Sequence, residues 1–276
     1  GMERVVADAL MDVGERFRPG PQVFVPEEVP TPRNVRYQRS VQTLERVLRE
    51  LRRQHEGRDG DDVLAILLRQ REEDAVDDDL LRDQMMTMLL AGYDTTALTL
   101  TYAWWLLADH PEVERRFHEE VDALDGPPTA DDLADLEVLD RIVTETMRLY
   151  PPAYVVYREA EEEDELGGFR IPAGSVVSTP QWVVHHDRRW FDDPWAFRPE
   201  RWTDDFRREL PDFAYFPFGG GPRKCIGDGF AMREAKLVLA TLGQRYELDR
   251  VTEAFDLVPL VTLHPDGPVE MTVRRR

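Results

Sequence analysis

Apolar residues recur at intervals of three and four along the first 150 positions and again after residue 229. This spacing predicts amphipathic helices, and clusters of proline or glycine separate one predicted helix from the next. Between and after these segments, short runs of Val, Ile, Tyr and Phe lie between glycines and prolines, which predicts short strands. The predicted helices cover residues 2–17, 37–57, 61–70, 77–109, 111–124, 133–150, 181–187 and 230–246. The predicted strands cover residues 153–160, 169–180, 246–250, 255–265 and 269–276. The pattern therefore indicates a mainly α-helical fold with small β-sheets, and 276 residues suffice for one large domain or two small ones.

The predicted helix over residues 77–109 is unusually apolar. Its stretch Met85–Leu107 carries a single charge, Asp94, and is long enough to cross a bilayer. A charge near the centre, five threonines and the lack of basic flanks argue against a membrane span. We therefore expect a central core helix that is buried on nearly all sides, and no membrane partner.

The charge balance narrows the classes of partner. Acidic residues outnumber basic ones by 55 to 35, which gives a formal net charge of −20. A protein this acidic lacks the basic surface that nucleic acids require, so we expect no nucleic-acid partner. Its 42% of hydrophobic residues can fill a core, which excludes a disordered chain.

The amino-terminal residues and the cysteine count indicate the compartment. Residues 2–17 hold acids and no continuous apolar segment, which is unlike a signal peptide. One cysteine, Cys225, excludes an internal disulfide and fits a reducing environment. We therefore expect a cytoplasmic protein.

That cysteine lies in the sequence FPFGGGPRKCIGDGF, residues 216–230. One interpretation is a small buried side chain in a turn, and a second is a cysteine nucleophile paired with His185 or His186. A third is a metal ligand, because the predicted helix directly after the loop would stabilise a thiolate at its amino-terminal end. A single thiolate does not make a structural zinc site, but it suits an iron whose other ligands come from a porphyrin.

The pattern Phe218-x-x-Gly221-x-Arg223-x-Cys225-x-Gly227 resembles the haem-binding signature of the cytochrome P-450 superfamily of haem-thiolate monooxygenases. The resemblance implies a haem b cofactor whose iron is bound by Cys225. It also implies that the other cofactor-binding residues lie beside the haem or pair with its propionates. These residues are Phe218, Gly219, Gly227, Ala91, Arg158 and Arg223.

A second family motif lies in the long helix, Ala91-Gly92-Tyr93-Asp94-Thr95-Thr96. A threonine hydroxyl that bonds back to its own helix can open the backbone ladder and leave a groove. The resemblance implies that Asp94 and Thr95 are catalytic and help to deliver protons to iron-bound dioxygen.

Two weaker motifs follow, Glu145-Thr146-Met147-Arg148 and Pro199-Glu200-Arg201-Trp202. Glu145 and Arg148 lie three residues apart on one helix face and can pair. The resemblance implies that Glu145, Arg148 and Arg201 form a buried structural network behind the cysteine loop. It also implies that His185 and His186 belong to the scaffold.

The resemblance implies a monooxygenase that inserts one oxygen atom into a small apolar substrate. We expect electrons from a ferredoxin or flavoprotein, because no nucleotide-binding GxGxxG loop accompanies the motifs. Five bases could form the docking patch for that donor: Arg115, Arg116, Arg223, Lys224 and Lys236. Family members carry more chain before the long helix, so the resemblance implies that residues 1–276 are a single domain, the C-terminal portion of that fold. The alternative is a truncated, non-catalytic remnant or fragment with no competent haem site.

The acidic composition generates a first prediction, that the protein comes from a halophilic source. Salt screens the repulsion between like charges, so the free energy of unfolding should rise as KCl is added. Urea denaturation at increasing KCl concentration measures this, and a flat or falling dependence would contradict the prediction.

Overall fold

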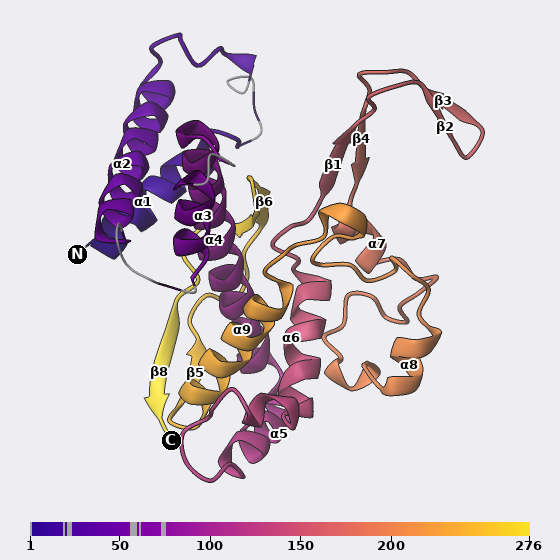
Figure 1. Cartoon of the computed structure of the whole chain (residues 1–276). Helices are drawn as coiled ribbons and strands as arrows, with labels where there is room; N and C mark the ends of the chain where they lie inside the picture. The colour runs from indigo at the N-terminus through magenta and orange to yellow at the C-terminus, as the bar shows by residue number, and fades with distance from the viewer. Residues whose placement is uncertain (1, 19, 21–23, 56–59, 61, 73–75) are drawn as a thin grey trace. The chain divides into compact units, whose positions relative to one another are not determined.

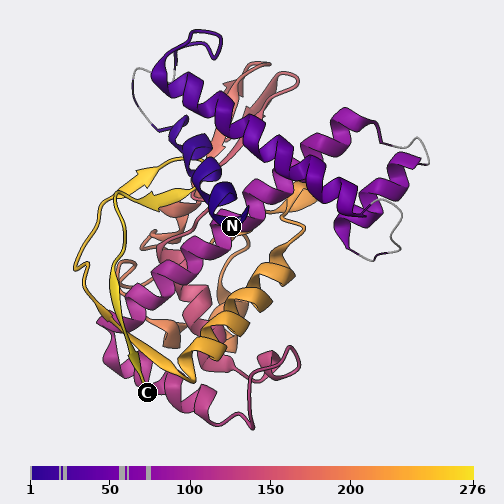
Figure 2. The same cartoon turned by 90° about the vertical axis from the view of Figure 1, so that its left-hand side faces the viewer.

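The structure is a computed structural model that describes residues 2–18, 20, 24–55, 60, 62–72 and 76–276 (Figures 1 and 2). Its α-helices are α1 (Met2–Glu15), α2 (Pro32–His55), α3 (Val63–Glu72), α4 (Asp78–Asp109), α5 (Pro111–Asp122), α6 (Glu137–Leu149), α7 (Gln181–His185), α8 (Asp204–Glu209) and α9 (Asp228–Gly243). The 3-10 helices are η2 (Asp132–Ala134), η3 (Pro199–Arg201) and η4 (Gly221–Arg223). The predicted mainly helical character is therefore confirmed. The expected helix end at residue 57 and helix start at residue 61 lie outside the described residues.

Eight short strands are present among the described residues, and they pair as four two-stranded sheets. The pairs are β1 (Val156–Glu159) with β4 (Val176–Thr179), β2 (Asp164–Leu166) with β3 (Phe169–Ile171), β5 (Tyr246–Arg250) with β8 (Met271–Arg275), and β6 (Leu257–Pro259) with β7 (Leu263–Pro265). The β1–β4, β2–β3 and β5–β8 pairs are antiparallel. Figures 1 and 2 both show β5 and β8 side by side.

Several of the predicted segments differ from the structure. The run 169–180 is two strands, β3 and β4, because a turn closes between them at Gly174, whose φ is +77°. The run 255–265 is likewise two strands, β6 and β7. The acidic run 161–165 precedes two glycines, a pattern that predicts an exposed hairpin tip at the acids, but its last two residues belong to β2. The tip instead lies at Gly167 and Gly168, which both have positive φ values of 59° and 84°.

Residue contacts divide the chain into two compact units. The first unit comprises Gly1–Asp94 and Pro259–Val261. In it, α1 packs on α2 through buried apolar side chains such as Leu10 and Leu44. A second cluster joins α2, α3 and α4 through Leu48, Leu68 and Leu81. The expectation of a single domain over residues 1–276 stays a prediction.

The second unit comprises Thr95–Val258 and Thr262–Arg276, and it contains the cysteine loop. Its core gathers the carboxyl-terminal half of α4 with α5, α6 and α9. Phe117, Ile142 and Leu239 are fully buried there, and burial of each such side chain stabilises the fold by roughly 1.5–3 kcal/mol.

Packing between α5 and α9 leaves no room for a side chain at the end of α9. A Cβ atom at Gly243 would lie 2.3 Å from Cζ of Phe117, so the two helices approach closely only because this residue is glycine. By contrast, a Cβ atom at Gly229 in the first turn of α9 would meet nothing within 4 Å.

No helix in the described part of the chain is both long and apolar enough to cross a membrane. Asp94 and the threonines lower the hydropathy of α4, as the sequence indicates.

Candidate functional site

The cysteine loop, residues 216–227, is held by a short series of backbone hydrogen bonds. The Gly219 N–H donates to the carbonyl of Phe216 over 2.9 Å, which closes a turn at the start of the loop. The Cys225 N–H donates to the carbonyl of Phe218 over 2.9 Å, which closes the loop around η4. The backbone position of Cys225 therefore depends directly on residues 216–218.

The backbone conformation or the packing of the loop requires glycine at each of the three consecutive positions 219–221. Gly219 and Gly221 have φ values of 71° and 68°, a region that L-residues with a side chain rarely adopt. Gly220 is extended, but a Cβ atom on it would lie 2.2 Å from the ring of Phe213. The loop can take this shape only with small residues at all three positions.

The thiol of Cys225 is exposed and free. Helix α9 begins at Asp228, two residues before the predicted start at residue 230, and Gly227 occupies its N-cap position. Asp228 pairs with Lys224 over 2.5 Å, and this hydrogen bond holds the pKa of its carboxyl below the usual range.

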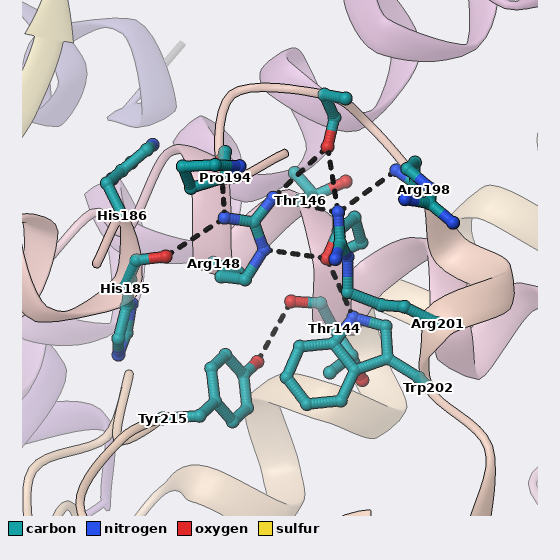
Figure 3. Close-up of polar contacts among 12 residues, drawn as sticks. Thr144, Thr146, Arg148, His185, His186, Pro194, Arg198, Arg201, Trp202 and Tyr215 are labelled. Carbon is teal, nitrogen blue, oxygen red and sulfur yellow. Dashed lines mark hydrogen bonds and ion pairs between the residues drawn. The ribbon is translucent and has the colours of Figure 1, made fainter. Parts of the chain in front are cut away.

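Behind the loop, Glu145 on α6 is a buried carboxylate that accepts five hydrogen bonds. Arg148 donates two of them through Nε and Nη2, each over 2.8 Å (Figure 3 draws the Arg148 contacts). Arg201 donates through Nε over 3.0 Å, the Arg198 N–H donates over 3.0 Å, and Nε1 of Trp202 donates over 2.8 Å. The carboxylate is therefore fully compensated although its side chain is inaccessible to solvent.

Arg148 uses all five of its N–H groups. Besides the two bonds to Glu145, it donates to the carbonyls of His185, Pro194 and Ala196 over 2.9, 2.6 and 3.2 Å (Figure 3). His185 ends α7, and the other two carbonyls belong to the irregular segment 186–202 that contains η3. One buried side chain thus fastens the end of α7 and this segment to α6.

The structure therefore brings Glu145, Arg148 and Arg201 together as one network. Sequence reasoning missed Trp202 as a donor, although it directly follows Arg201 in the Pro-Glu-Arg-Trp motif. A tryptophan N–H is donor-only and needs an acceptor when it is buried, and that requirement was the available signal.

Helix α7 connects this network to the cysteine loop. Nε2 of His185 accepts the N–H of Phe216 over 2.9 Å, and the amide nitrogen of Gln181 donates to the Phe216 carbonyl. Burial, with the nearby Arg148 as a second cause, lowers the pKa of His185 to about 3. Burial also lowers the pKa of His186, whose Nδ1 lies 2.6 Å from the Trp182 carbonyl, to about 4.

His185 is not available as a catalytic base for the cysteine. It is fully buried, and its Nε2 is occupied by the Phe216 N–H. This arrangement disfavours a cysteine nucleophile paired with His185 and agrees with a scaffold role for that residue.

In α4, Ala91, Asp94 and Thr95 lie in regular α-helix. The helix is continuous across this motif. The hydroxyl of Thr99 donates to the Thr95 carbonyl over 2.9 Å without interrupting it. Asp94 and Thr95 are half-buried, and Ala91 is exposed.

The two arginines expected to meet propionates are both exposed. Arg158 lies on β1 and donates to the carbonyl of Tyr157 over 2.8 Å, whereas Arg223 ends η4 two residues before Cys225. A surface guanidinium of this kind is accessible to a carboxylate ligand.

The five bases expected to dock a redox partner do not form a free basic patch. Arg115 pairs with Glu112 and Glu119 on its own helix. Lys236 is mostly buried and pairs with Asp140, and Lys224 pairs with Asp228 as described above. Most of the positive charge in this set is therefore neutralised within the chain.

The residues of the loop fit a haem. The described residues contain no group of three or more His, Cys, Asp or Glu side chains that could hold a metal ion. An iron bound by Cys225 would therefore need its other ligands from a cofactor, such as the nitrogens of a porphyrin. Cys225 offers one exposed thiol, and open space lies where a Cβ atom would be at Gly219 and Gly221. A bulky ligand could therefore approach the sulfur over these glycines.

The Glu145 network generates a stability prediction. In Glu145→Gln an amide N–H would face donors, and Arg148 and Arg201 would lose their buried counter-charge. We expect the free energy of unfolding to fall by about 3–5 kcal/mol. Urea denaturation measures the loss. The matched control is Glu137→Gln, which breaks the surface pair with Arg141 on the same helix and should change the value by less than about 0.5 kcal/mol.

The neutral His185 generates a pH prediction. Its pKa is lower in the folded than in the unfolded protein, so its contribution to stability is complete above pH 6.5 and is lost as the pH falls toward 3. Between pH 7 and pH 5, wild type should lose about 2 kcal/mol more of its unfolding free energy than His185→Gln, because only the unfolded wild type takes up the proton. Equal losses in the two proteins would contradict a neutral buried imidazole.

Comparison with known proteins agrees with this site. The sequence model of the family "Cytochrome P450" matches residues 23–266. The chain is 40% identical over 257 residues to cyclooctat-9-en-7-ol 5-monooxygenase of Streptomyces melanosporofaciens, covering 91% of this chain and 56% of the relative. It is 39% identical over 260 residues to pentalenene oxygenase of Streptomyces avermitilis, covering 90% of this chain and 54% of the relative. It thus spans about half the length of these relatives.

A solved cytochrome P450, CYP102L1, has a similar fold. The two superpose with a TM-score of 0.82 at 25% identity, over 98% of this chain and 64% of that structure. The predicted fold class is therefore confirmed. Since the family model matches most of the chain, and relatives match it at about 40% identity, this chain belongs to the cytochrome P450 family.

Proposed function

We propose that this chain provides the haem-thiolate portion of a monooxygenase, which inserts one atom of dioxygen into a small apolar organic substrate. The observation that carries the proposal is the exposed Cys225 on a loop whose glycines leave its face open. Membership of the cytochrome P450 family implies a haem cofactor, and we propose haem b. Two relatives bear the names of oxygenases, which supports the reaction class.

In this proposal, the chain's own residues bind and orient the cofactor. The Cys225 thiolate would be the protein ligand to the iron, and Phe218, Gly219 and Gly227 would line the same face. Arg223 and Arg158 would donate charge-assisted hydrogen bonds to the propionates. The bound haem supplies the activation of dioxygen, with the thiolate favouring cleavage of its O–O bond.

Proton delivery is assigned to α4 by family resemblance. The Asp94 carboxylate would hold a proton and pass it to Oγ1 of Thr95, the next residue of the helix. Ala91, one helical turn earlier, would lie beside the haem. These three assignments stay proposals.

Electrons would come from a separate ferredoxin or flavoprotein. Because Arg115, Lys224 and Lys236 already pair with acids of this chain, the docking surface cannot rely on them as free charges. Arg116 and Arg223 make no such ion pair with the described residues, so they remain candidates for the docking surface.

We also propose a cytoplasmic setting, since an exposed free thiol persists best where disulfides are kept reduced.

A haem titration tests the function. The purified chain should take up one equivalent of haem, and the reduced carbon-monoxide complex should show the red-shifted Soret band of thiolate ligation. Cys225→Ser should lose that band because a serine hydroxyl does not supply a thiolate. Arg223→Leu should weaken haem affinity about tenfold, the typical effect of losing one charge-assisted hydrogen bond.

Glu112→Gln on α5 is the control for the titration, since it alters only an exposed pair. A wild-type chain that takes up no haem would overturn the proposed function and favour a non-catalytic remnant. Haem uptake with an unchanged band in Cys225→Ser would show that another group binds the iron.

A further inference from the structure

Helix α7 is only five residues long, yet two of its side chains converge on one peptide unit of the cysteine loop. Gln181 and His185 lie four residues apart, on one face of the helix, and both are fully buried. Nε2 of His185 accepts the N–H of Phe216 over 2.9 Å. The Gln181 amide nitrogen donates to the carbonyl of the same residue. The backbone of Phe216 is therefore held from both its donor and its acceptor side.

Two further hydrogen bonds carry this constraint to the thiol. The Phe216 carbonyl also accepts the Gly219 N–H, which closes the first turn of the loop. The Phe218 carbonyl, inside that turn, accepts the Cys225 N–H. The position of the Cys225 backbone thus follows from the position of Phe216.

Helix α7 is itself fixed to the buried charge network. Nη1 of Arg148 donates to the main-chain carbonyl of His185 over 2.9 Å (Figure 3). The same histidine therefore accepts from Arg148 through its backbone and from Phe216 through its ring. It is a direct bridge between the Glu145 network and the cysteine loop.

Stability alone gives a poor account of Gln181. Its Oε1 atom is buried and has no hydrogen-bond partner among the described residues. A buried acceptor without a partner is destabilising, whereas an apolar side chain of the same size would avoid that cost. The hydrogen bond from its amide nitrogen to Phe216 is the one interaction that requires a glutamine rather than an apolar residue.

We propose that Gln181 and His185 are positioning residues that set where Cys225 presents its sulfur to the haem iron. Both are fully buried and act through the Phe216 peptide. This inference rests on the proposed haem-thiolate function and adds two residues to it that the signature motifs do not contain.

The discriminating variant is Gln181→Met. It removes the donor to Phe216 and also removes the unpartnered oxygen, so the urea midpoint should stay close to that of wild type. His185→Leu removes the acceptor for the Phe216 N–H, and His185→Gln restores an acceptor at the position of Nε2. Gly243→Ala is the control, because it perturbs the core beside Phe117 without altering any bond to the loop.

Amide hydrogen exchange in the haem-free chain is the first readout. In Gln181→Met and His185→Leu, the amides of Gly219 and Cys225 should exchange about five- to tenfold faster, as expected when one hydrogen bond that limits local opening is lost. His185→Gln should restore most of the protection. Gly243→Ala should lower the urea midpoint and leave these two amides unchanged.

The reduced carbon-monoxide spectrum is the second readout. At equal haem loading, Gln181→Met and His185→Leu should show a smaller fraction of the thiolate band than wild type and Gly243→Ala. Unchanged exchange at Gly219 and Cys225 would overturn the inference, and so would faster exchange with an undiminished thiolate band. Failure of wild type to bind haem would overturn the proposed function instead, and the exchange data would still decide whether α7 anchors the loop.

Discussion

The second unit of this protein depends on a single carboxylate held away from water. Glu145 has no solvent access, so its charge is tolerated only because five donors surround it. Arg148 is equally inaccessible and equally saturated. A saturated buried network of this kind permits few alternative arrangements, because moving any member leaves a charge or an N–H without a partner. The irregular segment 186–202 therefore has a defined path although it contains little regular secondary structure.

The cysteine loop takes its shape from two different sources. Its internal geometry comes from glycines, which allow the positive φ values at Gly219 and Gly221 and the close approach of Phe213 to Gly220. Its attachment to the rest of the unit comes from α7, where His185 and Gln181 hold Phe216. The glycines lie within the signature motif. His185 precedes Phe216 by 31 residues and lies outside that motif. The cysteine loop, which contains unusual φ values, is thus held in place by hydrogen bonds from the regular helix α7.

Helix positions were predictable from sequence because long amphipathic segments repeat their pattern over many residues, as in α2 and α6. The bounds of short strands were harder to predict, because a single glycine can end a strand. Gly174 divides one predicted strand into two, and the hairpin tip lies at Gly167, beyond the acidic run. Glu145, Arg148 and Arg201 could be named from motifs, but their backbone partners could not. Every residue has a main-chain carbonyl, so nothing in the sequence identifies those of His185 and Pro194 as the ones that accept from Arg148. The uninterrupted course of α4 past Thr95 could not be decided from the sequence either, since the threonine pattern allows back-bonding with or without a distortion.

Almost all the basic residues of this chain are arginines, and this has a practical consequence for the loop. The two lysines are Lys224 and Lys236, and the second is mostly buried against Asp140. The accessible side-chain amine therefore belongs to Lys224, directly beside the sole thiol of the chain, Cys225. Amine-directed dyes and cross-linkers and thiol-directed probes would accordingly attach to adjacent residues of one loop. For this protein, the two standard labelling chemistries are perturbations of the candidate site itself, and a neutral reporter would need a cysteine introduced elsewhere after Cys225 has been protected.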